Sequence, residues 1–169
     1  SPELALRSAV VPLLVALDAT RAEAVRRGVT DPELPVVRIT LGAIMDQGDR
    51  MRGIGADPAL RDAITTMMRL AESTSVDDRL RATAVLALSA LGGDVVRDWL
   101  LSHLVRRTRV LNRLALHEPG TLAVASLHAL RRDWRGDAVV RPALELAQRE
   151  ARDARWLTLA VDRAPDDRA

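Results

Sequence analysis

The sequence contains no cysteine, no lysine, no phenylalanine and no tyrosine. Without cysteine the chain can form neither disulfide bonds nor thiolate metal sites. Trp99, Trp134 and Trp156 are its only Phe, Tyr or Trp residues, so the core must consist mainly of Leu, Val, Ile and Ala. No apolar run approaches the roughly 20 residues of a membrane-spanning helix. These absences predict no membrane partner, and we expect a cytoplasmic location.

The residues that are present favour helices. The 169 residues suit one helical domain over 1–169, which would bury roughly two thirds of the unfolded surface. Ala, Leu and Arg dominate, and all three are strong helix formers. Arg as the only strong base, together with abundant Ala, is typical of a GC-rich bacterial genome. Because the chain begins with Ser1, we expect it to be a fragment of a longer protein, whose other part could carry a catalytic or DNA-binding module.

Charge is distributed unevenly along the chain, whose net charge is +2. Residues 1–96 carry 11 Arg and 13 Asp or Glu, whereas residues 97–169 carry 14 Arg and 10 Asp or Glu. A net charge this small is a weak signal for nucleic-acid binding.

Helix start and stop signals recur at short intervals. "SPEL" places Ser1 as an N-cap before Pro2, and the helical pattern that follows continues to Gly28. "ADPAL" starts another helix after Asp57, and Gly92 and Gly93 end a third. No segment alternates apolar and polar residues between hairpin turns, so the sequence predicts an all-α fold of about eight helices with no sheet.

Two apolar templates alternate along the chain. One reads "VVPLLVALD" at 10–18 and "VVRPALELA" at 139–147, and the other reads "LRATAVLALSALG" at 80–92 and "LAVASLHAL" at 122–130. Alternating amphipathic helices at a period near forty residues predict a helical-repeat stack, since one helix pair cannot bury its apolar faces alone. The expected antiparallel helix pairs cover 1–48, 57–92, 94–134 and 137–163. The alternative is an irregular α-helical bundle.

The second template resembles the second helix of a HEAT repeat. That family often reads D-x-x-V-R-x-x-A-x-x-A-L-x-x-L-G, and the matching residues here are Asp77, Leu80, Arg81, Ala84, Ala87, Leu88, Leu91 and Gly92, with Leu80 in place of Val. The resemblance implies a right-handed α-solenoid of about four helix pairs. It also implies a non-enzymatic scaffold that binds another protein or another domain of its own chain. In such a stack, Leu88 is buried and Arg81 bonds to a neighbouring helix.

No pattern in the sequence indicates catalysis. His103, His117 and His128 lack metal-ligand spacing to each other or to an acid, and no nucleophile elbow or phosphate loop is present. The sequence therefore predicts no catalytic, cofactor-binding or metal-binding residue, no cofactor and no enzymatic activity.

Two arginine clusters are candidate partner-binding sites. They comprise Arg106, Arg107, Arg109 and Arg113 in "RRTRVLNR", and Arg131, Arg132, Trp134 and Arg135 in "RRDWR". Arginines with a stacking aromatic could bind nucleic acid, which is one alternative function. The structural alternative is a solvated helix end with Trp134 packed at the helix exit.

A further alternative comes from residues 58–70 and 81–100. "PALRDAITTMMRL" and "RATAVLALSALGGDVVRDWL" resemble later helices of the ligand-binding and dimerisation core of tetracycline-repressor-type transcriptional regulators. This resemblance implies a dimer with a closed apolar cavity.

Overall fold

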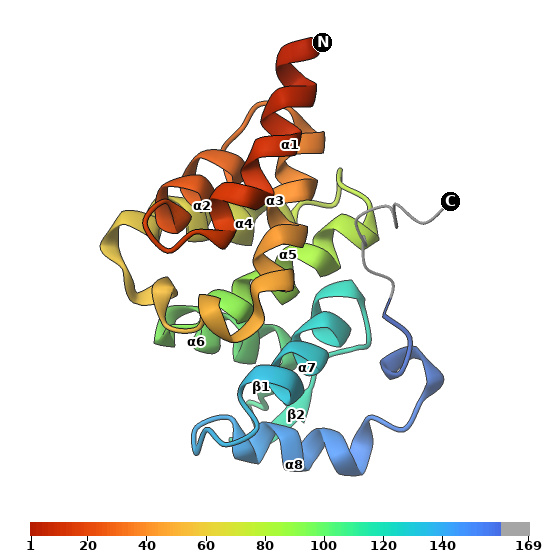
Figure 1. Ribbon diagram of the computed structural model, residues 1–169. Coiled ribbons are helices and arrows are strands. Elements are labelled where there is room, and N and C mark those ends of the chain that lie inside the picture. Colours follow the sequence, from red (N-terminus) through yellow and green to blue (C-terminus); the bar gives the residue numbers. More distant parts are fainter. Residues whose placement is uncertain (160–169) are drawn as a thin grey trace.

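The computed structural model describes residues 1–159, which form eight α-helices, four short 3-10 helices and one two-stranded hairpin (Figure 1). The α-helices are α1 (Pro2–Ala16), α2 (Arg21–Val29), α3 (Leu34–Gln47), α4 (Arg61–Glu72), α5 (Asp78–Leu91), α6 (Asp94–Leu104), α7 (Thr121–Asp133) and α8 (Arg141–Glu150). The 3-10 helices are η1 (Gly48–Met51), η2 (Ile54–Ala56), η3 (Pro58–Leu60) and η4 (Ala154–Trp156), and the strands are β1 (Val105–Arg107) and β2 (Leu114–Leu116).

Polar side chains start several of these helices, as the sequence predicts for Ser1 and Asp57. The hydroxyl of Ser1 accepts a hydrogen bond from the backbone N–H of Leu4 at 3.2 Å. The carboxylate of Asp77 accepts one from Leu80 at 3.0 Å, at the start of α5. These acceptors satisfy N–H groups that have no partner within the first turn of a helix.

Helix α5 lies at the centre of the molecule. Every residue from Ala82 to Leu91 is buried, because α3, α4, α6 and α7 pack around it. Alanines at positions 82, 84, 87 and 90 let the neighbouring helices approach closely. The predicted burial of Leu88 is confirmed, since its side chain has no solvent exposure.

Helices two apart in sequence lie against each other in space. Helix α1 packs on α3, α3 packs on α5, and α5 packs on α7. Two of the predicted pairs also pack as expected, α4 on α5 and α6 on α7. The all-α class is therefore confirmed for the described residues, apart from one hairpin.

The hairpin contradicts the prediction of no sheet. Strands β1 and β2 pair antiparallel, with Val105 opposite Leu116 and Arg107 opposite Leu114. In this segment the sequence predicts only the arginine cluster at 106–113. Each strand is three residues long, too short for alternation to be visible, and the pairing depends on where α6 ends.

Two helix boundaries also differ from the prediction. The predicted helix up to Gly28 breaks after Ala16, because Arg21 turns back and donates hydrogen bonds to the carbonyls of Val15 at 3.0 Å and Ala16 at 3.1 Å. This buried guanidinium thereby satisfies the free carbonyl end of α1. In the last predicted helix pair, 137–163, α8 is followed in the described residues only by the short 3-10 helix η4, and residues 160–163 lie outside the described residues.

Candidate functional site

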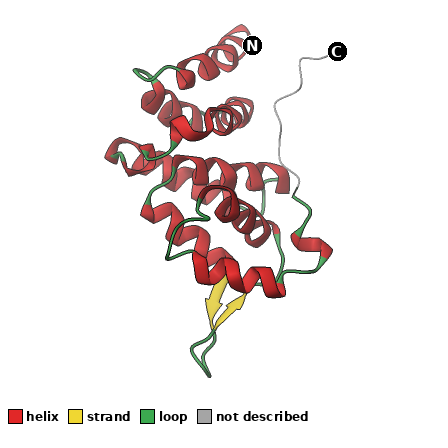
Figure 2. Cartoon of the chain, turned by 60° about the horizontal axis from the view of Figure 1, so that its bottom comes forward, coloured by secondary structure: helices red, strands yellow, loops and turns green. Residues whose placement is uncertain are grey.

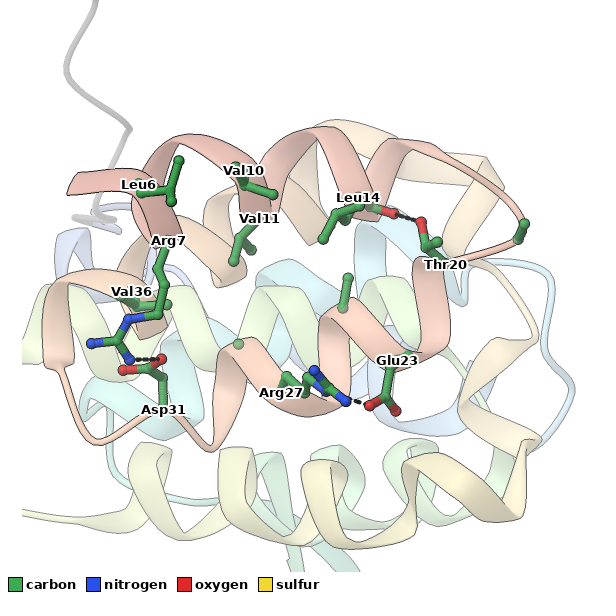
Figure 3. Close-up of a pocket in the computed structure, with 13 residues that line it drawn as sticks. Leu6, Arg7, Val10, Val11, Leu14, Thr20, Glu23, Arg27, Asp31 and Val36 are labelled. Carbon is green, nitrogen blue, oxygen red and sulfur yellow. Dashed lines mark hydrogen bonds and ion pairs between the residues drawn. The ribbon is translucent and has the colours of Figure 1, made fainter. Parts of the chain in front are cut away.

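An apolar groove of about 600 Å³ lies between α1 and α2, with α3 at its base (Figure 3). Val11 and Leu14 point from α1 toward α2, as Figure 3 shows. The lining is mainly aliphatic, with Leu6, Val10, Val11, Leu14, Ala19, Ala24, Gly28 and Val36 among its members. A groove of this size and lining is typical of a binding surface.

The outer face of α1 continues this apolar surface. Leu6 and Leu13 are 65% and 66% exposed, and their spacing of seven residues places them on one helix face. Leu17, the residue that follows the end of α1, is 56% exposed. Val15 is the only buried residue of α1. The helix therefore presents more apolar surface than its contact with α3 covers.

Charged pairs flank the groove. The guanidinium of Arg7 donates a 2.6 Å hydrogen bond from Nη1 to the carboxylate of Asp31, whose side chain is nine-tenths buried. The buried Nε of Arg7 has no hydrogen-bond partner among the described residues. Further along α2, hydrogen bonds from Arg26 and then Arg27 lower the pKa of the Glu23 carboxyl to about 2. The groove is thus apolar along its length and charged at its margins.

Close contact between α2 and α3 forms the base of the groove. A Cβ atom built at Gly28 would lie 2.2 Å from Oγ1 of Thr40, closer than any real contact. Thr40 is fully buried and donates to the carbonyl of Val36 at 2.7 Å. Glycine at position 28 is therefore what lets the two helices pack at this distance.

No motif in the sequence predicts the groove. A signal was nonetheless present, because the run from Leu4 to Leu17 is apolar on more sides than one packed helix face requires. Which side stays uncovered depends on the docking of α1 on α3, which the run itself does not specify.

The structure places the first arginine cluster on the hairpin, which projects beyond the helices (Figure 2). The backbone N–H of Thr108 donates to the carbonyl of Arg113 at 2.8 Å, so a four-residue loop forms the tip. Asn112 adopts a positive φ of 47°, a conformation that Asn tolerates well. At the tip, Val110 and Leu111 are 91% and 64% exposed.

The hairpin arginines form no ion pair within the described chain. Arg106, Arg107, Arg109 and Arg113 are all exposed. Within residues 1–159 their side chains form one hydrogen bond, from Nη1 of Arg107 to the carbonyl of Asn112 at 3.4 Å. The nearest acids in sequence are Asp98 and Glu118. Many other arginines are instead paired with acids.

The second cluster, at the end of α7, has a different environment. Trp134 packs against the core, and its Nε1 donates to the hydroxyl of Ser89 at 3.2 Å. Arg132 pairs with Asp133 at 2.6 Å and also donates to the carbonyl of Leu86. Arg131 is half-buried and Arg135 is exposed. Trp134 is thus engaged within the fold, as the packed helix-exit interpretation expects, and the structure does not bring this cluster together with a free aromatic face.

The three histidines contact different partners. His103 lies 3.2 Å from the carboxylate of Glu72, His117 lies 3.0 Å from the carbonyl of Ser102, and His128 lies 3.1 Å from the carbonyl of Trp156. Within residues 1–159 no group of three His, Asp or Glu side chains is arranged to hold a metal ion. None of the helices in that range has both the length and the apolar character to cross a bilayer.

Compared with models of known protein families, with curated proteins and with solved structures, the chain gives no match.

Proposed function

We propose that this chain is a non-enzymatic binding domain whose α1–α2 groove holds an amphipathic helix of another protein or of another domain of its own chain. One observation carries the proposal: the outer face of α1, with Leu6 and Leu13, and the adjoining Leu17 are apolar and uncovered beside an apolar groove. Exposed apolar surface of this kind marks interaction sites in proteins.

The shape of the site favours a helical partner. A partner helix lying along α1 would place side chains spaced three, four and seven residues apart into the groove. The flanking groups Arg7, Asp31 and Glu23 supply both signs of charge for its polar edge. The partner we expect is therefore amphipathic and carries both acidic and basic residues.

The proposal includes a HEAT-like arrangement of the helices. Its support is the packing of α1 on α3, α3 on α5 and α5 on α7, together with α4 on α5 and α6 on α7. Stacked helix pairs share a core in this manner. The tetracycline-repressor-type alternative is less favoured, because the groove lies between α1 and α2 and not among α4, α5 and α6, which carry that resemblance.

Photocrosslinking tests the proposal. A photoreactive amino acid replaces Leu13 on α1, and a matched variant carries it at Val139, which is similarly exposed just before α8. We expect the Leu13 probe to give one recurrent crosslinked peptide with apolar residues at helical spacing, which the Val139 probe does not give. Adding Leu6→Glu and Leu17→Glu should abolish that crosslink.

Other occupants give different results. Crosslinks from the Leu13 probe to a second copy of the chain, with a dimer in sedimentation equilibrium, would assign the face to self-association. Equal crosslinking from both probes would contradict the proposal.

A further inference from the structure

The hairpin of residues 105–116 carries positive charge on both of its faces. Arg106 and Arg107 are adjacent on β1, so their side chains point to opposite sides of the ribbon. Arg109 lies on the β1 side of the tip and Arg113 on the β2 side. From Asp98 to Glu118 no acidic residue intervenes. The charge therefore surrounds the ribbon and does not lie on one side of it.

The base of the hairpin fixes its direction. Val105 and Leu116 pack against the core, and the backbone N–H of His117 donates to the carbonyl of Leu104 at 2.9 Å. Leu104 itself is fully buried. The five residue steps from Val105 to Val110 span up to about 17 Å, at the rise of an extended strand. The base of the hairpin is thus anchored, with β2 against α8, and its tip projects beyond the helices (Figure 2).

We propose that this hairpin binds duplex DNA by entering a groove of the double helix. A flat anionic surface, such as a membrane or an acidic protein face, would meet only one side of the ribbon. The groove of a duplex instead has phosphates along both walls, where arginines on both faces of the ribbon can reach them. The major groove of B-form DNA, about 12 Å wide, admits a two-stranded ribbon.

The tip of the hairpin agrees with this partner. Val110 and Leu111 lie in the loop at the end of the hairpin, and both are apolar and exposed to solvent. In a groove they face the base edges, where aliphatic side chains contact thymine methyl groups. A-form RNA has a deep and narrow major groove, so the same ribbon fits duplex RNA poorly. The site is separate from the α1–α2 groove and does not depend on the function proposed for it.

The test measures binding to a fluorescein-labelled 20-base-pair DNA duplex by anisotropy over 50–200 mM salt. Four phosphate contacts predict a slope of log affinity against log salt of about −3 to −4, hence a loss of roughly 100-fold over this range. The variant with Arg106→Gln, Arg109→Gln and Arg113→Gln should reduce the slope to about −1. Circular dichroism checks that the variant keeps the helix content of the parent.

A matched control removes the same charge elsewhere. Arg61, Arg69 and Arg79 are exposed on α4 and α5, and Arg61→Gln, Arg69→Gln and Arg79→Gln together should leave the slope unchanged. Equal slopes for the two triple variants would overturn the proposal. So would binding to phosphatidylserine vesicles or poly-glutamate without binding to the duplex, or equal affinity for duplex RNA.

A second variant tests the tip. Val110→Ser with Leu111→Ser keeps every arginine, so the salt slope should stay the same while the affinity falls several-fold. Unchanged affinity for the duplex would overturn the placement of the hairpin inside the groove.

Discussion

Arg81 on α5 donates a 2.9 Å hydrogen bond from its Nε to the main-chain carbonyl of Ala71 on α4. Its Nη1 also contacts Asp78, three residues earlier, at 2.8 Å, and only 15% of its side chain is exposed. The resemblance to HEAT repeats implied that Arg81 bonds to a neighbouring helix, and this contact is confirmed. One side chain thereby links the end of α4 to the start of α5.

Replacing Arg81 with alanine should lower the free energy of unfolding by about 1–3 kcal/mol, because it removes the donor from a carbonyl at the α4–α5 junction. The exposed pair with Asp78 contributes only a few tenths of this. Urea denaturation measures the change. Arg79→Ala, an exposed arginine of the same helix, is the control and should stay within about 0.5 kcal/mol of the parent. A loss no larger for Arg81→Ala than for Arg79→Ala would mean that the hydrogen bond to Ala71 does not contribute.

Leu88→Ala should cost about 2–5 kcal/mol, since Leu88 is fully buried in the central helix and its truncation leaves a cavity. Leu13→Ala removes the same atoms from an exposed position on α1 and should change the stability by less than about 0.5 kcal/mol. Thermal and chemical denaturation of both variants test the contrast. A loss below about 1 kcal/mol at Leu88 would contradict its place in the core.

Alanine substitutions at Gly28 and Gly42 should change the stability of the fold in opposite directions. Gly28→Ala places a Cβ against Thr40 and should destabilise the fold by about 1–3 kcal/mol through overpacking. Gly42→Ala lies within α3, where a Cβ meets nothing within 4 Å, and should stabilise by about 0.4–1 kcal/mol. Melting temperatures of the two variants measure the difference. If both variants changed the melting temperature in the same direction, the close packing of Gly28 against Thr40 would not be what determines the effect on stability.

The pH dependence of stability should include a contribution from Glu23. Its pKa in the folded chain is about 2, below the ordinary value of 4.5, because Arg26 and Arg27 bond to the carboxylate. A lowered folded-state pKa stabilises the fold above about pH 4.5, and this contribution is lost as the pH falls toward 2. NMR titration of the Glu23 carboxyl measures the pKa directly. Arg26→Gln with Arg27→Gln should return it toward 4.5, and a midpoint near 4.5 in the parent would contradict the assignment.

Local patterns in the sequence predict most of the helices and much of the core. Caps such as Ser1 and Asp57 act on backbone groups two or three residues away, so their effect can be predicted from the local sequence. The apolar stripe of 80–91 also identified the buried helix α5, because a long periodic pattern reports burial directly. The contact of Arg81 with a neighbouring helix was expected only from the resemblance to HEAT repeats.

Where the helices break, which of them pack together and which apolar faces stay exposed depend on the tertiary structure. The break after Ala16 depends on Arg21 reaching back to α1, and Trp134 is held by Ser89, 45 residues away in sequence. The hairpin forms where the anchored ends of 105–116 meet, and the groove exists because α1 docks on α3 with one apolar face left open. Such contacts join residues distant in sequence, and each depends on the simultaneous placement of several helices. Local patterns therefore fix which residues are apolar or charged, whereas packing decides which of them stay exposed.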